Sequence, residues 1–311
     1  MALPVIVDCD PGHDDAIALV VAARHADLLG VTTVAGNAPV ERTTRNALVL
    51  LDLLEHPAPV HRGAARPLLA EPKHAAYVHG ESGLDGADLP EPARAEAGED
   101  AAAFIVETAR AHEGVWLVPT GPLTNVALAL RRAPDLVDRI AGISLMGGSA
   151  AVGNRTPVAE FNIWADPEAA AIVFDCGARV IQAGLHLTHG LQTTPERLAE
   201  LRAMPNRLGP LLGQLLGFFA ATYVARHDGF VGAPIHDVCA VLALTHPELF
   251  ARRLTHVTVE TDGTHTRGMT VVDLRPLKEL AGRPEATTEV LMSVDQHQAF
   301  RVILDAIGSF P

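Results

Sequence analysis

The chain has only three cysteines among its 311 residues, Cys9, Cys176 and Cys239, and no CxxC pair. An odd number without paired spacing indicates neither a disulfide framework nor a zinc site. Runs of lysine or arginine are missing as well, and the formal net charge is −13. Such a charge repels nucleic-acid backbones and anionic lipid. The sequence therefore predicts no nucleic-acid partner and no membrane partner.

Long hydrophobic runs are also missing, since no stretch reaches the roughly 18 apolar residues of a membrane-spanning helix. The opening residues MALPVIVDCD lack the basic region and cleavage site of a signal peptide, so we expect a cytoplasmic protein. Hydrophobic residues make up 48% of the sequence, enough for a substantial core. Because no internal repeat or linker divides the chain, residues 1–311 are expected to form a single domain.

Short β-branched runs alternate with segments of helical period, a pattern typical of a mostly parallel sheet covered by helices. We therefore expect an α/β, Rossmann-like fold with the active site at the C-terminal ends of the strands. The predicted strands are 3–8, 30–35, 115–119, 143–146, 178–184, 255–261 and 268–273. The predicted helices are 15–25, 40–55, 100–112, 123–132 and 236–244, followed by a terminal helix. Residues 195–245 as a whole are expected to be mainly helical.

One segment, 71–98, is rich in glycine, proline, alanine and acidic residues and shows no period. This composition predicts a long loop, and long loops in compact enzymes often cover active sites.

Four carboxylates follow the first predicted strand within eight residues: Asp8, Asp10, Asp14 and Asp15. The C-terminal end of such a strand is where open α/β sheets bind ligands. Carboxylates crowded there repel one another, and a hard divalent cation offsets that repulsion. The alternative is that Asp14 only caps the next helix, with Asp15 favoured in its first turn by the helix dipole.

The segment DCDPGHDDAIAL resembles the signature DxDPGxDDxxAL of the inosine–uridine preferring nucleoside hydrolases. Further similar segments follow in order over nearly the whole chain: TTVAGN, HGESGLDG, PTGPLTNVA, MGG, GNRTPVAEFNIWADPEAA and APIHD. The resemblance implies that a calcium-bound water hydrolyses the N-glycosidic bond of a small-molecule ribonucleoside to ribose and free base. It also implies a homodimer or a homotetramer.

The resemblance implies a calcium ion held by Asp10, Asp15, the carbonyl of Thr124, and Asp237, with Asp10 also acting as the general base. All of these are hard oxygen donors, as calcium prefers. Without the resemblance, Thr124 would be interpreted as an ordinary helix N-cap.

The substrate is expected to contact a set of polar residues that the resemblance assigns. Glu160 and Asn162 are two positions apart, so in an extended segment they would point the same way while Phe161 faces the core. A solvent-facing polar strand edge is the alternative. The assigned residues are Asp14, Asn37, Asn154, Glu160, Asn162, Asp237 and His79, the last as a candidate for the pocket wall.

A departing nucleobase needs a proton donor, and an imidazole near its ordinary pKa suits that task. His236, directly before Asp237, is the candidate that the resemblance supports. His13 is interpreted as non-catalytic. The HxxH spacing of His186 and His189 lies in what looks like a strand end, and no metal site is predicted there.

Two other functions stay open at this stage. Asp8 and Asp10 have the DxD spacing of haloacid-dehalogenase-like, magnesium-dependent phosphatases, although Pro11 and Gly12 follow where that family has other residues. The second alternative is a non-catalytic, calcium-dependent nucleoside or ribose-binding protein. Retention of Asp10 and His236 favours an active enzyme.

Overall fold

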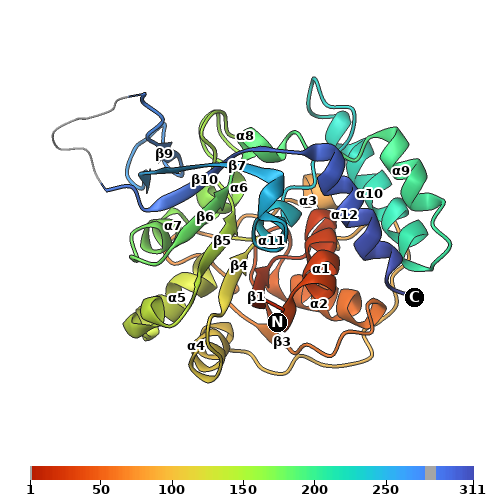
Figure 1. The fold of residues 1–311 in the computed structure, drawn as a ribbon, viewed down its shortest axis with the longest axis horizontal. Coiled ribbons are helices and arrows are strands. Elements are labelled where there is room, and N and C mark those ends of the chain that lie inside the picture. Colours follow the sequence, from red (N-terminus) through yellow and green to blue (C-terminus); the bar gives the residue numbers. More distant parts are fainter. Residues whose placement is uncertain (1, 277–284) are drawn as a thin grey trace.

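A central sheet of eight strands organises the computed structural model, which describes residues 2–276 and 285–311 (Figure 1). Neighbouring strands are parallel except β10 and β7, which pair antiparallel at one edge. Across the sheet the strands are β3 (Val60–Arg62), β2 (Asp27–Thr33), β1 (Pro4–Cys9), β4 (Trp116–Pro119), β5 (Gly142–Met146), β6 (Val180–Ala183), β10 (Thr288–Val294) and β7 (Phe250–Thr255).

The sheet has a hydrophobic core on each face because successive side chains of a strand point in opposite directions. Val5 and Val7 of β1 belong to one core, and Ile6 belongs to the other. The first core is completed by helices α1 (His13–His25), α2 (Val40–Leu53), α10 (Leu208–Val224), α11 (Val238–Thr245) and α12 (Gln296–Gly308). The second contains α4 (Ala101–Ala111), α5 (Thr124–Arg132) and α7 (Pro167–Phe174).

The chain changes direction across the sheet between β1 and β4. It runs outward from β1 through β2 to β3, and then returns to β4 and continues to β5 and β6. The carboxyl ends of β1 and β4 therefore border the crevice in which open α/β sheets bind ligands. The acidic segment 10–15 follows β1, and the segment 120–124 follows β4.

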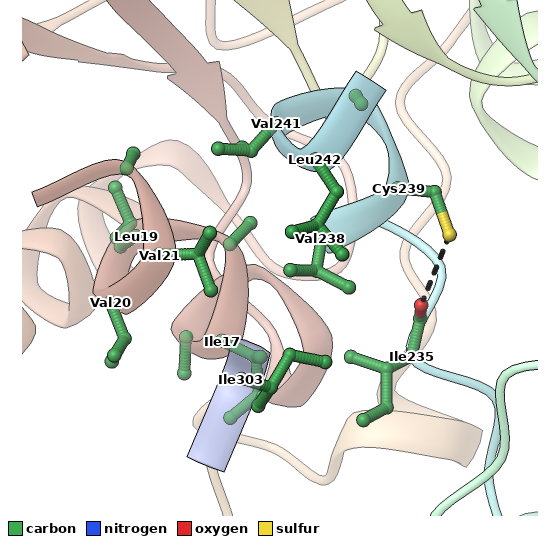
Figure 2. Packing of buried hydrophobic residues seen from close by; sticks show 14 of the residues in the cluster. Ile17, Leu19, Val20, Val21, Ile235, Val238, Cys239, Val241, Leu242 and Ile303 are labelled. Carbon is green, nitrogen blue, oxygen red and sulfur yellow. Dashed lines mark hydrogen bonds between the residues drawn. The ribbon is translucent and has the colours of Figure 1, made fainter. Parts of the chain in front are cut away.

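Helices α1 and α11 lie against each other through aliphatic side chains (Figure 2). Ile17, Val21 and Val238 are fully or almost fully buried there, together with Ile303 from α12. Asp14 and Asp15 lie in the first turn of α1, and Asp237 is the N-cap of α11. This packing therefore brings together carboxylates that are far apart in the sequence.

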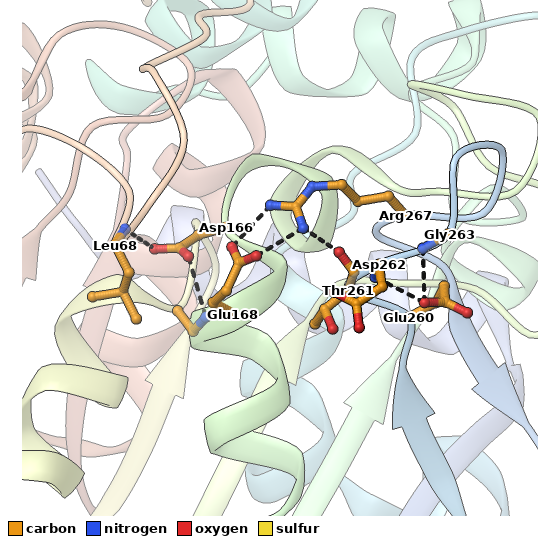
Figure 3. Close-up of polar contacts among 9 residues, drawn as sticks. Leu68, Asp166, Glu168, Glu260, Thr261, Asp262, Gly263 and Arg267 are labelled. Atoms are coloured by element: carbon orange, nitrogen blue, oxygen red, sulfur yellow. Dashed lines mark hydrogen bonds and ion pairs between the residues drawn. The ribbon is translucent and has the colours of Figure 1, made fainter.

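The smaller elements complete the rim of the molecule. Figure 3 shows Arg267, beside the hairpin, paired with Glu168 of α7. These elements are helices α3 (Ala76–His79), α6 (Phe161–Ala165), α8 (Leu185–Thr188) and α9 (Pro195–Arg202), the 3-10 turns η1 (Pro134–Asp138) and η2 (Pro247–Leu249), and a separate hairpin of β8 (Val257–Val259) and β9 (Thr270–Val272).

The predicted α/β class and the mostly parallel sheet are confirmed. The strands predicted at 255–261 and 268–273 are confirmed as β8 and β9, which form a hairpin separate from the central sheet. Strands β3, β10 and most of β7 were not predicted. β7 (FARRLT) is an edge strand with solvent on one side, so its charged residues hide the strand pattern.

Among the described residues, no helix is both long and apolar enough to cross a membrane.

We expect Ile17→Ala to lower the free energy of unfolding by about 2–5 kcal/mol, because it leaves a cavity between α1 and α11. Ile17 is 0% exposed. The matched control is Leu128→Ala on α5, where Leu128 is 39% exposed and little should change. Urea unfolding followed by circular dichroism measures both. Equal losses in the two variants would contradict this account of the core.

Candidate functional site

Four buried carboxylates meet at the carboxyl end of β1. Asp10 follows the strand, Asp14 and Asp15 begin α1, and Asp237 begins α11; none is more than 5% exposed. Carboxylate oxygens of Asp14, Asp15 and Asp237 lie within 4.8 Å of one another. Both helices direct their N-termini here, where their dipoles favour negative charge.

Asp10 is held by its surroundings on one side only. Its Oδ2 accepts the backbone N–H of Asn37 at 2.6 Å, whereas its buried Oδ1 has no hydrogen-bond partner within the described parts of the chain. A Cβ on Gly36 or Gly121 would collide with this carboxylate. Two glycines therefore let the backbone approach Asp10 closely, and one carboxylate oxygen remains unengaged.

Asp15 is fixed by donors from three loops, of which the amide of Asn37 is the most distant at 3.4 Å. Its Oδ2 accepts the backbone N–H of Gly12 at 2.9 Å, and its Oδ1 accepts the hydroxyl of Thr120 at 2.8 Å. Gly12 is the N-cap of α1, so the interpretation of Asp14 as the helix cap is wrong. The carboxylate that folds back onto this helix end belongs to Asp15.

Burial and mutual repulsion act on the protons of this cluster. Burial, followed by the Asp15 carboxylate, raises the pKa of Asp14 to about 7. Burial, followed by repulsion from Asp14 and Asp15, raises the pKa of Asp237 well above its usual value. Burial and the Asp15 carboxylate likewise raise the pKa of Asp10. A divalent cation among these oxygens would relieve both effects, so the residues present fit a metal ion.

Thr124 is the first residue of α5, and Leu123 is the N-cap, so the interpretation of Thr124 as an N-cap is wrong. The Thr124 hydroxyl donates to Asp166 at 2.7 Å. Asp166 also accepts the backbone N–H of Leu68 at 2.9 Å (Figure 3). This network fixes the first turn of α5, and the role of the Thr124 carbonyl as a metal ligand stays a prediction.

Asp8 does not share the environment of the other carboxylates. Its Oδ1 accepts the Thr32 hydroxyl at 2.6 Å and the Asn125 amide at 2.7 Å. Burial raises the pKa of Asp8 to about 7, partly opposed by these two hydrogen bonds. Asp8 therefore connects β1 to β2 and α5, whereas Asp10, Asp14 and Asp15 lie with Asp237.

A cavity that reaches Asp14 and Asp237 brings together all seven predicted substrate ligands. Its lining includes Asp14, Asn37, His79, Asn154, Glu160, Asn162, His236 and Asp237. Asn37 also donates its amide to the carbonyl of Asp10 at 3.2 Å. The structure thus places segments from five parts of the sequence around one space, while the contacts of each residue with a substrate stay predictions.

The expected extended segment at Glu160 and Asn162 is wrong. Glu160 is the N-cap of α6, and its carboxylate accepts the backbone N–H groups of Asn162, Ile163 and Gly148. Phe161, expected to face the core, is instead part of the cavity lining. Glu160 and Asn162 both reach the cavity because a helix begins there. Burial raises the pKa of Glu160 to about 7.

Asn162 and Asn154 are oriented by backbone groups. The Asn162 amide nitrogen donates to the carbonyls of Thr120 at 2.7 Å and Met146 at 3.2 Å, which leaves its carbonyl oxygen for another partner. Asn154 accepts the backbone N–H of Phe161 at 2.9 Å and is exposed at the cavity rim.

His236 and His79 line the same cavity and are almost fully buried. Burial, with repulsion from His189 and His227, lowers the pKa of His236 well below its usual value. The role of His236 as proton donor to the base stays a prediction. Burial also lowers the pKa of His79, whose Nδ1 lies 3.1 Å from Nδ1 of His13.

Aromatic residues form a wall that the sequence analysis missed. The chain has only two tyrosines, and both Tyr77 and Tyr223 line the cavity with Phe219 and His227. The rings of Phe219 and Tyr223 meet edge to face at 5.8 Å. The signal in the sequence was that several of the few aromatic residues lie in α10. The sequence of α10 resembles an ordinary apolar helix, which hides this signal.

His186 and His189 have separate environments. His186 accepts the backbone N–H of Ala150 at 3.0 Å and contacts the carbonyl of Leu291 at 2.8 Å, so it joins a loop to β10. His189 lies behind His236, with ring centroids 5.6 Å apart. The segment is helix α8, directly after β6, and the expectation of a strand end is wrong at these two residues.

Comparison with known proteins gives consistent matches. The sequence profile described as inosine-uridine preferring nucleoside hydrolase matches residues 5–301. The pyrimidine-specific ribonucleoside hydrolase RihA of Salmonella paratyphi A is 47% identical over 300 residues, which cover 95% of each chain. A solved purine-preferring ribonucleoside hydrolase from Gardnerella vaginalis has a TM-score of 0.91, with 31% identity and 98% of both chains covered. For a solved inosine-guanosine nucleoside hydrolase the TM-score is 0.89, with 30% identity and 99% of both chains covered.

These matches extend over nearly the whole sequence and include every segment that forms the carboxylate cluster and the cavity. The chain therefore belongs to the inosine-uridine preferring nucleoside hydrolase family, enzymes that hydrolyse the N-glycosyl bond of ribonucleosides to ribose and free base.

Proposed function

We propose that this enzyme is a calcium-dependent hydrolase of pyrimidine ribonucleosides. The observation that carries the proposal is the buried carboxylate cluster at one end of a cavity that also holds polar groups suited to a sugar and rings suited to a base. Family membership makes the alternative of a haloacid-dehalogenase-like phosphatase wrong.

Calcium is the proposed cation because the group consists of carboxylates, and hard oxygen donors in a flexible number suit this ion. Asp10, Asp15, Asp237 and the Thr124 carbonyl would hold it. When bound, the cation would supply positive charge that lowers the pKa of a water at the site and open positions for sugar hydroxyls. Asp14 is close enough to contribute as well.

Asp10 is proposed as the general base. Its unengaged Oδ1 takes a proton from the attacking water as the water oxygen forms a bond to C1′ of the ribose. The C1′–N bond breaks in the same process, and its electron pair leaves with the base. The oxocarbenium-like character of such a reaction favours a nearby negative charge, which the carboxylates provide.

The sugar is proposed to bind between Asn37, Asn154, Glu160 and Asn162, beside Asp14 and Asp237. The backbone hydrogen bonds of Glu160 and Asn162 fix the directions in which their oxygens face the cavity. A polar site that pairs each hydroxyl rejects a sugar that lacks one, because its own groups are then left unpaired. The site is therefore built for ribose.

The base is proposed to lie against the aromatic wall, beside His79 and His236. A pyrimidine is favoured because the RihA relative, named as pyrimidine-specific, is 47% identical, whereas the solved purine-preferring enzyme is 31% identical. The polar edges of His79 and His227 suit the oxygen and nitrogen atoms of a pyrimidine ring.

The homodimer or homotetramer expected from the sequence stays a prediction, which size-exclusion chromatography with light scattering checks.

The proposal is tested with a reducing-sugar assay on uridine, cytidine, inosine and adenosine. We expect kcat/KM for uridine to exceed that for inosine by at least about tenfold, and 2′-deoxyuridine to react roughly 10⁴-fold more slowly than uridine. Stoichiometric binding of uridine without turnover would instead identify a non-catalytic binding protein. Faster hydrolysis of inosine would reverse the base preference.

Calcium is expected to stabilise the chelated protein by about 2.7 kcal/mol at a concentration of 100 Kd, raising the thermal midpoint. The comparison variant is Asp237→Asn. It removes one of the repelling carboxylates, so the metal-free protein should become more stable while the calcium response shrinks. Differential scanning fluorimetry measures both. A calcium response unchanged in Asp237→Asn would remove Asp237 from the ligand set.

Asp10→Asn is expected to lower kcat by roughly 10²–10⁴-fold, because the amide cannot accept the proton of the attacking water. The matched control is Asp8→Asn, in a buried residue of β1 two positions before Asp10, whose hydrogen bonds an amide oxygen can still accept. Uridine hydrolysis in Asp8→Asn should stay within about tenfold of the wild type. Comparable activity of the two variants would contradict the assignment of the base.

A further inference from the structure

One hydrogen bond behind the cavity decides which nitrogen of His236 carries a proton. The hydroxyl of Thr188 lies 2.7 Å from Nδ1 of His236. Thr188 is 0% exposed, whereas His236 retains 7% exposure and lines the cavity. Because Nδ1 is engaged from behind, Nε2 is the nitrogen left to face the cavity.

The direction of this hydrogen bond follows from what else surrounds the hydroxyl. Within residues 2–276 and 285–311, Nδ1 of His236 is the only hydrogen-bond partner of Oγ1 of Thr188. If the hydroxyl accepted a hydrogen bond from an Nδ1–H group, its own O–H would be buried without an acceptor, which costs about 1–3 kcal/mol. The hydroxyl therefore donates to Nδ1, and Nδ1 carries the lone pair.

We propose that Thr188 is a positioning residue that holds His236 as the neutral tautomer with its proton on Nε2. The imidazole then presents an Nε2–H donor to the leaving base. The inference rests on the proposed function, in which His236 lies beside the base.

The position of the hydroxyl is rigidly defined. Thr188 ends the short helix α8, and its backbone N–H donates to the carbonyl of Gly184 at 3.1 Å. His186, two positions earlier in the same helix, forms a hydrogen bond with the carbonyl of Leu291 in β10. The imidazole of His236 also meets the ring of His189, the C-cap of α8, edge to face with centroids 5.6 Å apart. Two successive residues at the end of α8 therefore contact the ring of His236.

The opposite tautomer would oppose the reaction. When the C1′–N bond breaks, its electron pair moves onto the base, and negative charge develops on the ring. A lone pair on Nε2 would repel that charge, whereas an Nε2–H group stabilises it by a hydrogen bond. The proton that Asp10 takes from water balances the one that the released base finally gains, so no further reactant is needed.

Thr188→Val removes the hydroxyl and keeps the shape of the side chain, and Thr188→Ser keeps the hydroxyl. The substrates are uridine and 4-nitrophenyl riboside, whose leaving group needs little stabilisation. We expect Thr188→Val to lower kcat on uridine by roughly 10- to 100-fold with KM little changed. Activity on the nitrophenyl riboside should stay within about threefold, and Thr188→Ser should restore uridine turnover to within about threefold of the wild type.

His236→Ala separates this inference from the proposed function. If His236→Ala loses activity on uridine far more than on the nitrophenyl riboside while Thr188→Val resembles the wild type, the role of Thr188 is overturned and the proposed function stands. If His236→Ala loses activity equally on both substrates, the role of His236 at the leaving group is overturned and the inference with it, whereas hydrolysis of uridine still supports the proposed function. A parallel loss in Thr188→Val and His236→Ala on uridine alone supports the inference.

The tautomer is also observable without turnover. Nitrogen-15 NMR of the calcium-loaded enzyme distinguishes a protonated from an unprotonated ring nitrogen, and His236→Ala assigns the signal by its disappearance. We expect the wild type and Thr188→Ser to carry the proton on Nε2. A wild-type signal with the proton on Nδ1 would overturn the inference even if Thr188→Val failed to fold.

Discussion

Repulsion between buried carboxylates is the force that the surrounding structure has to overcome. Asp10, Asp14, Asp15 and Asp237 are held in a space where negative charge is unfavourable without a cation. The apolar packing of α1 against α11 keeps them together, and the two helix N-termini partly offset the repulsion. The hydrophobic core is thus what makes a cation site possible, because it resists the separation that the charges favour.

The sheet order explains why distant segments meet at this point. β1 and β4 are neighbours, and each is followed by a loop at the same edge of the sheet. Thr120, after β4, donates to Asp15, after β1, and its carbonyl accepts the amide of Asn162. One short segment therefore joins the carboxylates to the sugar side of the cavity. The residues proposed to bind the metal and those proposed to bind the sugar are positioned by the same backbone.

The carboxylates after β1 could be predicted because they form a local motif after a strand, as Asp10 and Asp15 show. Asp237 was identified only through resemblance, since nothing in its own segment reveals that α11 lies beside α1. The prediction for Glu160 failed because two-residue spacing does not distinguish a strand from the first turn of a helix. The aromatic wall was missed because apolar rings on α10 have the same pattern whether they face a core or a cavity.

The two sides of the cavity differ in how firmly they are built. The side proposed for the sugar is tied to the sheet, since Asn162 and Glu160 form hydrogen bonds with backbone groups that follow β4 and β5. The proposed base side consists of rings from α10 and the segment 75–79, which contact one another and the ring of His13 in α1. This division accounts for relatives that share the fold closely while their names specify pyrimidine or purine nucleosides.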